Sequence, residues 1–367
     1  MISPALCAGA AISPAHSADQ HSWSNALFSN TTHRFRNTAL LSVSRVEAPV
    51  VVSSAELDAR LADVYDRVGL RAGLLESRAG IRERRWWPQD VTFVEGAATA
   101  AAKAISESGV DVADFGLMVN TSIGRLHLEP STAVAVHDAI GLPRSCQNFD
   151  VTNACLGFMN GIEIAGAMID AGLTEYALVV NGEDSRPVQE ATIERLTQPG
   201  ITAQDVITEF AAFTLGSGAA AVVLGRADRH PEGHRVVAAA SRAATEHHRL
   251  CTGDNTVMTT DLKGLLHAGL RLSEDLWTES AGEFGWTEGV DRYIVHQVSQ
   301  VHTDAICTRL GLEPDRVPRS FPEYGNIGPV SVPFTLAGEA DSLTLGDRIL
   351  LMGIGSGLNA SVLEIAW

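Results

Sequence analysis

Short apolar runs alternate with longer stretches of helical periodicity from about residue 35 to the end of this chain. The short runs have the length of strands, and the longer stretches have that of helices. Strands are expected at 35–48, 115–122, 147–152, 176–180, 219–224, 234–244, 293–297, 349–353 and 362–367. Helices are expected from Ser53 onward and at 90–109, 128–140, 156–171, 189–197, 261–278 and 301–310.

Strands that alternate with helices predict an α/β protein with parallel-rich sheets and helices on both faces. The alternation starts again after Arg229, so we expect two similar halves, 35–229 and 230–367. Residues 1–34 are rich in Ala, Ser, His and Asn, which predicts a disordered N-terminal extension. The helix at 189–197 lies in a segment that we expect to cover a pocket.

The segment Asp150–Phe158, DVTNACLGF, predicts a strand end, a tight turn at Cys155 and the start of a nearly all-apolar helix. A thiol at a helix N-terminus meets the positive end of the helix dipole, which is expected to lower its pKa and favour the nucleophilic thiolate. The alternative is a small buried core cysteine. Gly157, Gly161 and Ala165 recur at four-residue spacing, which predicts a smooth face that another helix approaches.

Two distant segments offer partners for such a nucleophile. Residues 292–297, RYIVHQ, predict a short strand ending at His296, and residues 324–329, YGNIGP, predict a loop that presents Asn326. A cysteine nucleophile needs a base or cationic partner, which is usually distant in sequence. Singly, His296 is more often a structural histidine and Asn326 a turn residue. Together with Cys155, their positions at strand ends and in loops favour one active site.

A glycine-rich turn and a basic segment are further candidates. Residues 353–357, GIGSG, allow a close approach of backbone to a site, although such a turn between strands is also simply a hairpin. A basic-aromatic cluster is either a solvated turn or a nucleotide site, in which Arg pairs with phosphate and Trp stacks on the base. Its members are Arg82, Arg84, Arg85, Trp86 and Trp87.

Composition narrows the classes of partner. The net charge of −17 argues against nucleic acid and anionic membranes, and no apolar run is long enough to predict a membrane span. The five cysteines form no CxxC pair, so neither a metal site nor a disulfide framework is indicated, and a cytoplasmic location is the simplest. Cys146, Cys251 and Cys307 are expected to be structural. Four histidines are expected to lie at the surface or at helix caps: His127, His247, His248 and His302.

The segments DVTNACLGF, YIVHQ, YGNIGPVSVP and GIGSGLN, in this order, resemble the thiolase superfamily in its ketoacyl synthase III branch. AGIRERR at 79–85 fits the same branch. Within it, the chain is most similar to the condensing enzymes of long-chain olefin biosynthesis, from about Phe35 to Trp367. The resemblance implies a homodimer with the thiolase-like αβαβα five-layer fold, made of two similar halves.

The resemblance also implies roles for the candidate residues. Cys155 would carry an acyl group, and the backbone N–H groups of Cys155 and Ser356 would bind the oxyanion. His296 and Asn326 would donate to an enolate oxygen. Arg82 would contact coenzyme A.

Glu129 lies in LEPSTA, where ketoacyl synthase III sequences usually carry an apolar residue that reaches into the pocket of the partner subunit. The enzymes of olefin biosynthesis carry Glu here, which implies a base that removes an α-proton. In an acyl-lined pocket its pKa would be raised. An acidic residue before a proline at a helix start also complements the helix dipole, which would make Glu129 purely structural.

The resemblance therefore implies an acyltransferase that joins two fatty acyl-CoAs by non-decarboxylative Claisen condensation to a 2-alkyl-3-oxoalkanoate. Coenzyme A thioesters would be the substrates, without a cofactor, and enzymes of an olefin or β-lactone pathway would follow. Two alternatives stay open. A decarboxylating 3-oxoacyl-ACP synthase III is opposed by Glu129, and a non-catalytic partner subunit of a heterodimer is opposed by the intact set of Cys155, His296 and Asn326.

Overall fold

This computed structural model describes residues 32–254 and 256–367 of the chain. Its main element is a ten-stranded sheet. The strands follow the order β12-β13-β14-β9-β2-β8-β7-β5-β6, and β1 pairs with β9. Their bounds are β1 Thr32–Arg34, β2 Thr38–Glu47, β5 Phe115–Asn120, β6 Gln147–Asp150, β7 Tyr176–Glu183, β8 Gly218–Arg226, β9 His234–Ala243, β12 Arg292–Val295, β13 Arg348–Gly355 and β14 Asn359–Ala366. The extension expected at 1–34 lies outside the described residues, apart from β1.

Antiparallel neighbours outnumber parallel ones in the described sheet, so the expectation of parallel-rich sheets is wrong. β5 runs parallel to β6 and β7, and β12 runs parallel to β13, whereas the other neighbouring strands are antiparallel. One cause is the hairpin between β13 and β14, because a tight turn can join only antiparallel strands. The two halves of the sheet also meet antiparallel, where Leu40 of β2 pairs with His234 of β9.

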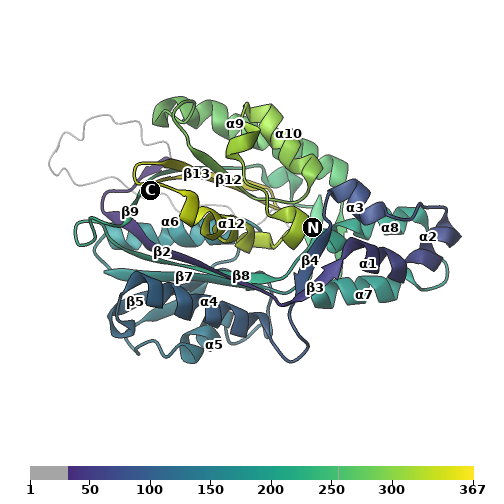
Figure 1. The fold of residues 1–367 in the computed structure, drawn as a ribbon, viewed down its shortest axis with the longest axis horizontal. Helices are drawn as coiled ribbons and strands as arrows, with labels where there is room; N and C mark the ends of the chain where they lie inside the picture. The colour runs from purple at the N-terminus through teal and green to yellow at the C-terminus, as the bar shows by residue number, and fades with distance from the viewer. Residues whose placement is uncertain (1–31, 255) are drawn as a thin grey trace, which may run out of the picture. The chain divides into compact units, whose positions relative to one another are not determined.

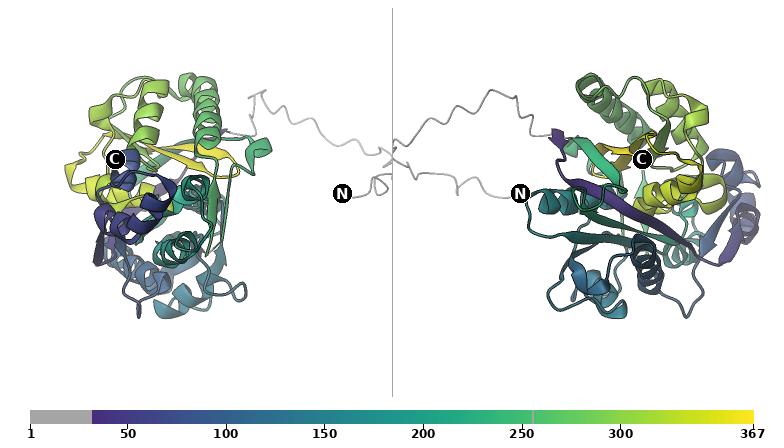
Figure 2. Two further views of the ribbon diagram at one scale, coloured as in Figure 1. Left: turned by 90° about the vertical axis from the view of Figure 1, so that its right-hand side faces the viewer. Right: turned by 60° about the vertical axis from the view of Figure 1, so that its left-hand side comes forward.

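Helices cover both outer sides of the sheet and fill the space between its halves (Figure 1). α4 (Phe93–Ser108) packs on β2, β7 and β8, while α9 (Leu262–Phe284) packs on β9 and β14 beside α10 (Gln300–Leu310). α6 (Gly157–Asp170) and α12 (Ser331–Glu339) lie in the middle and contact strands of both halves. The rotated views in Figure 2 keep α9 and α10, in green, on the side of the sheet opposite to the blue α4. This is the expected αβαβα order of layers.

The central helix α6 is apolar nearly all round because it is buried between the two halves. Ile162 belongs to the same hydrophobic core as Leu351 of the second half. Gly161 faces the sheet, where an added Cβ would lie 2.7 Å from Val179 and 2.8 Å from Thr121. The smooth face of α6 therefore packs on strands, not on another helix as expected.

A group of short elements stands beside one end of the sheet, at the right of Figure 1. Ser53 and Glu56 form a capping box that starts α1, as the sequence predicts. The two-stranded sheets β3–β4 and β10–β11 were not expected from the sequence. The bounds of these and the remaining elements are α1 Ser54–Arg60, α2 Ala62–Val68, α3 Leu74–Ala79, α5 Thr132–Ala139, α7 Arg186–Leu196, α8 Ala203–Glu209, α11 Phe321–Tyr324, β3 Val50–Ser53, β4 Glu83–Trp86, β10 Cys251–Gly253 and β11 Met258–Thr260. Among the described helices, none combines the length and apolarity that crossing a membrane requires.

Candidate active site

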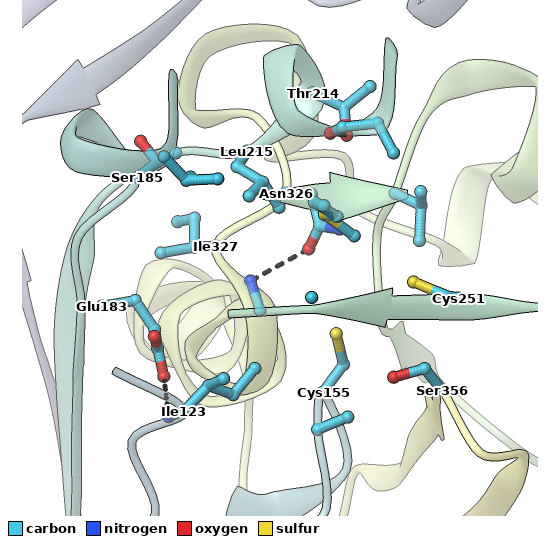
Figure 3. Close-up of a pocket in the computed structure, with 18 of the residues that line it drawn as sticks. Ile123, Cys155, Glu183, Ser185, Thr214, Leu215, Cys251, Asn326, Ile327 and Ser356 are labelled. Atoms are coloured by element: carbon cyan, nitrogen blue, oxygen red, sulfur yellow. Dashed lines mark hydrogen bonds between the residues drawn. The ribbon is translucent and has the colours of Figure 1, made fainter. Parts of the chain in front are cut away.

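Cys155 lies in the turn between β6 and α6, and its thiol points into a large cavity (Figure 3). Leu156 is the N-cap residue of α6, so Cys155 directly precedes the helix. Ala154 has a φ of 45°, a left-handed conformation that costs a residue other than glycine about 1–2 kcal/mol. Backbone strain of this kind clusters at functional sites.

The cavity has a volume of about 1370 Å³ and is lined by both halves of the sheet and by the short helices. Cys155, His296, Asn326 and Ser356 all line it, although they are far apart in sequence. Its walls are mainly apolar and include Phe93, Leu128, Val188, Ile207, Phe210 and Leu265. Because Val188 and Glu190 lie on α7, the segment expected to cover a pocket does form one of its walls.

The thiol of Cys155 is not the low-pKa group that its position before a helix predicts. Burial raises its pKa to about 12, and the neighbouring Cys251 and Glu183 act in the same direction. Its own backbone N–H lowers the pKa, but by less than burial raises it. Desolvation of the thiolate thus outweighs the helix dipole. The thiol carries its proton at neutral pH and needs a base nearby.

His296 follows directly after β12. Its backbone N–H donates to the carbonyl of Met352 at 2.7 Å, which ties it to β13. Burial lowers the pKa of His296 to about 3, and the nearby His302 contributes to this shift, so the imidazole is neutral before the reaction. Within the described residues, Nδ1 of His296 is buried without a hydrogen-bond partner.

His302 also lines the cavity, which corrects the expectation of a surface or helix-cap residue. Burial lowers its pKa to about 4. Glu183 is a second polar residue of the cavity wall that sequence reasoning missed. Sequence reasoning could have found Glu183 as it found His296, because each is a polar residue at the end of an apolar strand pattern.

Asn326 is presented by a loop that is fixed through its backbone. Its N–H donates to the carbonyl of Thr214 at 2.8 Å, and its carbonyl accepts from the N–H of Gly216 at 2.9 Å. The side-chain Oδ1 accepts from the N–H of Gly328 at 2.9 Å (Figure 3). Because this oxygen already accepts a hydrogen bond, the side chain of Asn326 can offer its NH₂ group as a hydrogen-bond donor to a ligand in the cavity.

Ser356 lies in the hairpin between β13 and β14, which packs directly on the turn of the cysteine. An added Cβ on Gly355 would lie 2.7 Å from the carbonyl oxygen of Asn153. Asn359 Nδ2 donates to Asn153 Oδ1 at 3.1 Å, which joins the two turns a second time. The hairpin thus also serves the site, and Ser356 lies beside Cys155 in Figure 3.

Glu129 does not line the cavity of its own chain. It is exposed, next to Leu128, which is 99% exposed. The helix that follows is anchored by Asp150, which accepts the N–H groups of Thr132 at 3.0 Å and Ala133 at 2.8 Å. Glu129 therefore sits at an exposed position on a segment whose far end is fixed.

The basic-aromatic cluster does not form the nucleotide site that its composition suggests. Trp86 and Trp87 are buried, and their indole N–H groups donate to Gln189 Oε1 at 2.6 Å and to the Glu183 carbonyl at 2.9 Å. Neither ring is free to stack on a ligand, because Trp86 and Trp87 are packed in two different hydrophobic cores. Arg82 is exposed, pairs with Glu323 at 3.0 Å and is not among the residues that line the cavity. The cationic side chains that do line it are Arg78, Arg125 and Arg186.

Comparisons with known proteins agree with this geometry. The families 3-oxoacyl-[acyl-carrier-protein (ACP)] synthase III and its C-terminal counterpart match residues 149–244 and 286–367. An acyl-CoA:acyl-CoA alkyltransferase of Xanthomonas campestris pv. campestris is 42% identical over 336 residues, which cover 91% of this chain and 99% of that protein. The Shewanella oneidensis protein of the same name is 37% identical, over 87% of this chain and 96% of that protein. The chain belongs to this alkyltransferase family.

Solved structures extend the likeness to the fold. A structure of Xanthomonas campestris OleA with bound lauric acid and lauroyl-CoA matches with a TM-score of 0.89 and 41% identity, covering 91% of this chain and 100% of that one. Other structures of that enzyme carry substitutions of a cysteine, a histidine or a glutamate. The resemblance to the thiolase superfamily, its ketoacyl synthase III branch and the olefin enzymes within it is confirmed, and so is the thiolase-like fold. The chain is an acyltransferase of this kind, while the roles of single side chains stay predictions.

Proposed function

We propose that this acyltransferase condenses two fatty acyl-CoAs without decarboxylation, through a cysteinyl acyl-enzyme, to a 2-alkyl-3-oxoalkanoate. The observation that carries the proposal is the meeting of Cys155, His296, Asn326 and Ser356 in one mainly apolar cavity. Its volume of about 1370 Å³ exceeds the usual range of about 300–1000 Å³ for small-molecule pockets, which suits two alkyl chains.

In the first half-reaction, His296 accepts the proton of the Cys155 thiol as sulfur attacks the thioester carbonyl. The backbone N–H groups of Cys155 and Ser356 stabilise the oxyanion of the tetrahedral intermediate. When the intermediate collapses, the bond to the coenzyme A sulfur breaks and that thiolate takes the proton from His296. The acyl group is then a thioester of Cys155.

In the second half-reaction, the carboxylate of Glu129 from the partner subunit removes an α-proton from a second acyl-CoA. His296 and Asn326 donate to the enolate oxygen, and the α-carbon attacks the acyl-Cys155 carbonyl. The Cys155 sulfur leaves as a thiolate and takes up a proton, which balances the proton that Glu129 removed. Water then hydrolyses the remaining coenzyme A thioester to the 2-alkyl-3-oxoalkanoate and free coenzyme A. The exposure of Glu129 on its own chain supports this action across a homodimer, as do the exposed apolar side chains of Leu126 and Leu128.

The proposal also covers coenzyme A binding, the location of the enzyme and the fate of its product. Arg82 remains a candidate for the outer part of coenzyme A, although it would have to leave Glu323 to reach it. We propose a cytoplasmic enzyme without a cofactor, whose product passes to enzymes of an olefin or β-lactone pathway.

Incubation of the purified protein with lauroyl-CoA alone, followed by mass spectrometry, tests the proposed function. A β-keto acid, or the ketone formed by its decarboxylation, is the expected product in the absence of any malonyl thioester. Product that appears only when malonyl-ACP is supplied would favour the decarboxylating synthase instead. Failure to label Cys155 under either condition would favour a non-catalytic subunit.

A further inference from the structure

Glu183, the last residue of β7, is a buried carboxylate on the cavity wall that the proposed reaction does not use. It is 9% exposed, and in Figure 3 its side chain reaches toward Ile123. Oε1 accepts the N–H of Ile123 at 2.7 Å, and Oε2 accepts the N–H of Gly124 at 3.4 Å. Burial raises the pKa of Glu183 to about 8, although the two N–H donors and Arg125 act in the opposite direction.

The two N–H groups belong to segment 121–131, which joins β5 to α5 and carries Glu129. The far end of this segment is held separately, because Asp150 accepts hydrogen bonds from the first turn of α5. Residues 126–130, between these two attachments, are exposed. Glu183 and Asp150 thus fix the two ends of the segment on which Glu129 stands.

We propose that Glu183 is a positioning residue for α-proton removal: it fixes segment 121–131 so that Glu129 reaches the cavity of the partner subunit. This inference rests on the proposed function, in which Glu129 acts across a dimer. It has a distinctive consequence. Although Glu183 lines the cavity of its own chain, its effect falls on the cavity of the partner.

The loop of Asn326 also lies close to Glu183, which offers a competing role. An added Cβ on Gly328, in this loop, would lie 3.7 Å from Glu183 Cγ. A residue acting through that loop would affect the cavity of its own chain. The two roles are therefore separated by asking which subunit of a dimer carries the altered Glu183.

Mixed dimers with a single working cysteine make this test. In the first arrangement, one chain carries both Cys155→Ala and Glu183→Gln, and its partner is wild type. The glutamine keeps one acceptor, but its NH₂ group opposes the second backbone N–H. Condensation is expected to fall about 10- to 100-fold relative to a dimer of Cys155→Ala with wild type, since misplacement by ~1 Å can cost about 10²-fold. Acyl labelling of Cys155 should stay unchanged.

In the second arrangement, Glu183→Gln is on the chain with the working Cys155, and the Cys155→Ala chain supplies an unaltered segment 121–131. The ratio of condensation to acyl labelling should then match that of the control dimer, because an effect of Glu183 on the thiol of its own chain changes acyl labelling and condensation together. The reverse pattern would place the effect in the Asn326 loop and overturn the proposal, and equal losses in both arrangements would make Glu183 merely structural.

Two further dimers complete the design. Asp184→Asn removes the neighbouring carboxylate, which accepts the N–H of Arg186 and the hydroxyl of Ser217. Because Asp184 lines the cavity of its own chain, a loss should appear only when it is on the chain with the working Cys155. A dimer of Glu129→Ala with Cys155→Ala tests the proposed function separately. If it regains no activity, action across the dimer fails and this inference with it. If it does, while the two Glu183 arrangements are alike, only this inference fails.

Discussion

At the residue scale, burial keeps both Cys155 and His296 uncharged at neutral pH. It raises the pKa of Cys155 to about 12 and lowers that of His296 to about 3, so a thiol and a neutral imidazole line the same cavity. Neither group carries an uncompensated charge in an apolar cavity, which would be costly. In the proposed acyl transfer, the proton transfer that creates charge would coincide with bond formation to the thioester, where the oxyanion donors would compensate it.

Glu129→Ala is expected to separate the two half-reactions. Acyl transfer needs only Cys155, His296 and the oxyanion donors, so labelling of Cys155 should survive. Product should fall by about 10²–10⁴-fold, the usual contribution of a general base. Intact-protein mass spectrometry and product quantification measure the two effects. Glu129→Gln, which keeps the side-chain volume, should behave like the alanine variant, and simultaneous loss of labelling would assign Glu129 a structural role.

At the element scale, glycines in turns allow the segments that form the site to pack closely together. Gly216, between the short helices and β8, pairs with the loop of Asn326, and an added Cβ would lie 1.9 Å from the carbonyl oxygen of Tyr324. No other residue type fits this position unless the loop shifts. The loop of Asn326 is therefore placed by the backbone of a segment more than a hundred residues earlier in the chain.

Gly216→Ala should lower the free energy of unfolding by about 1–3 kcal/mol, as overpacking usually does, and should reduce condensation because it displaces Asn326. Thermal unfolding and product formation are the measurements. Gly282→Ala is a matched control, since an added Cβ there meets no atom within 4 Å in helix α9. It should stabilise the protein slightly, by about 0.5–1 kcal/mol. Unchanged stability and activity of Gly216→Ala would show that the loop of Asn326 shifts without cost and would contradict this prediction.

Much of the element order was predictable because strand and helix periodicity is local. Cys155, His296 and Asn326 were found for the same reason, since each follows a recognisable strand or turn pattern. Burial of the basic-aromatic cluster was not predictable from local pattern, because Trp86 packs in one core with Ile193 and Leu196 of α7, more than a hundred residues later, while Trp87 packs against α4. The parallel-rich sheet was wrong because strand pairing depends on tertiary partners that periodicity does not reveal.

At the scale of the whole molecule, the cavity lies where the two halves and the short helices meet. Cys155 comes from the first half and His296 and Asn326 from the second, so the site exists only in the assembled fold. The same burial that tunes the site makes stability depend on pH.

Buried neutral histidines predict acid sensitivity. The pKa of His296 is lowered to about 3 and that of His302 to about 4, from an ordinary value of 6.5. Below pH 6.5 these two histidines bind protons in the unfolded chain but not in the folded chain. The free energy of unfolding should therefore fall as the pH drops from 6.5 toward 4. Melting temperatures across this range should show a shallower decline for His302→Gln than for the wild type. Parallel curves would contradict the assignment of His302 as a buried neutral group.

The central claim is that Cys155 carries the acyl group of the condensation, and exposure to lauroyl-CoA alone tests it most directly. Intact-protein mass spectrometry of the wild type should show one lauroyl adduct, peptide mapping should place it on Cys155, and a condensed product should accumulate. Cys155→Ala should show neither adduct nor product. A lauroyl adduct that persists in Cys155→Ala, or product formed by that variant, would contradict the account.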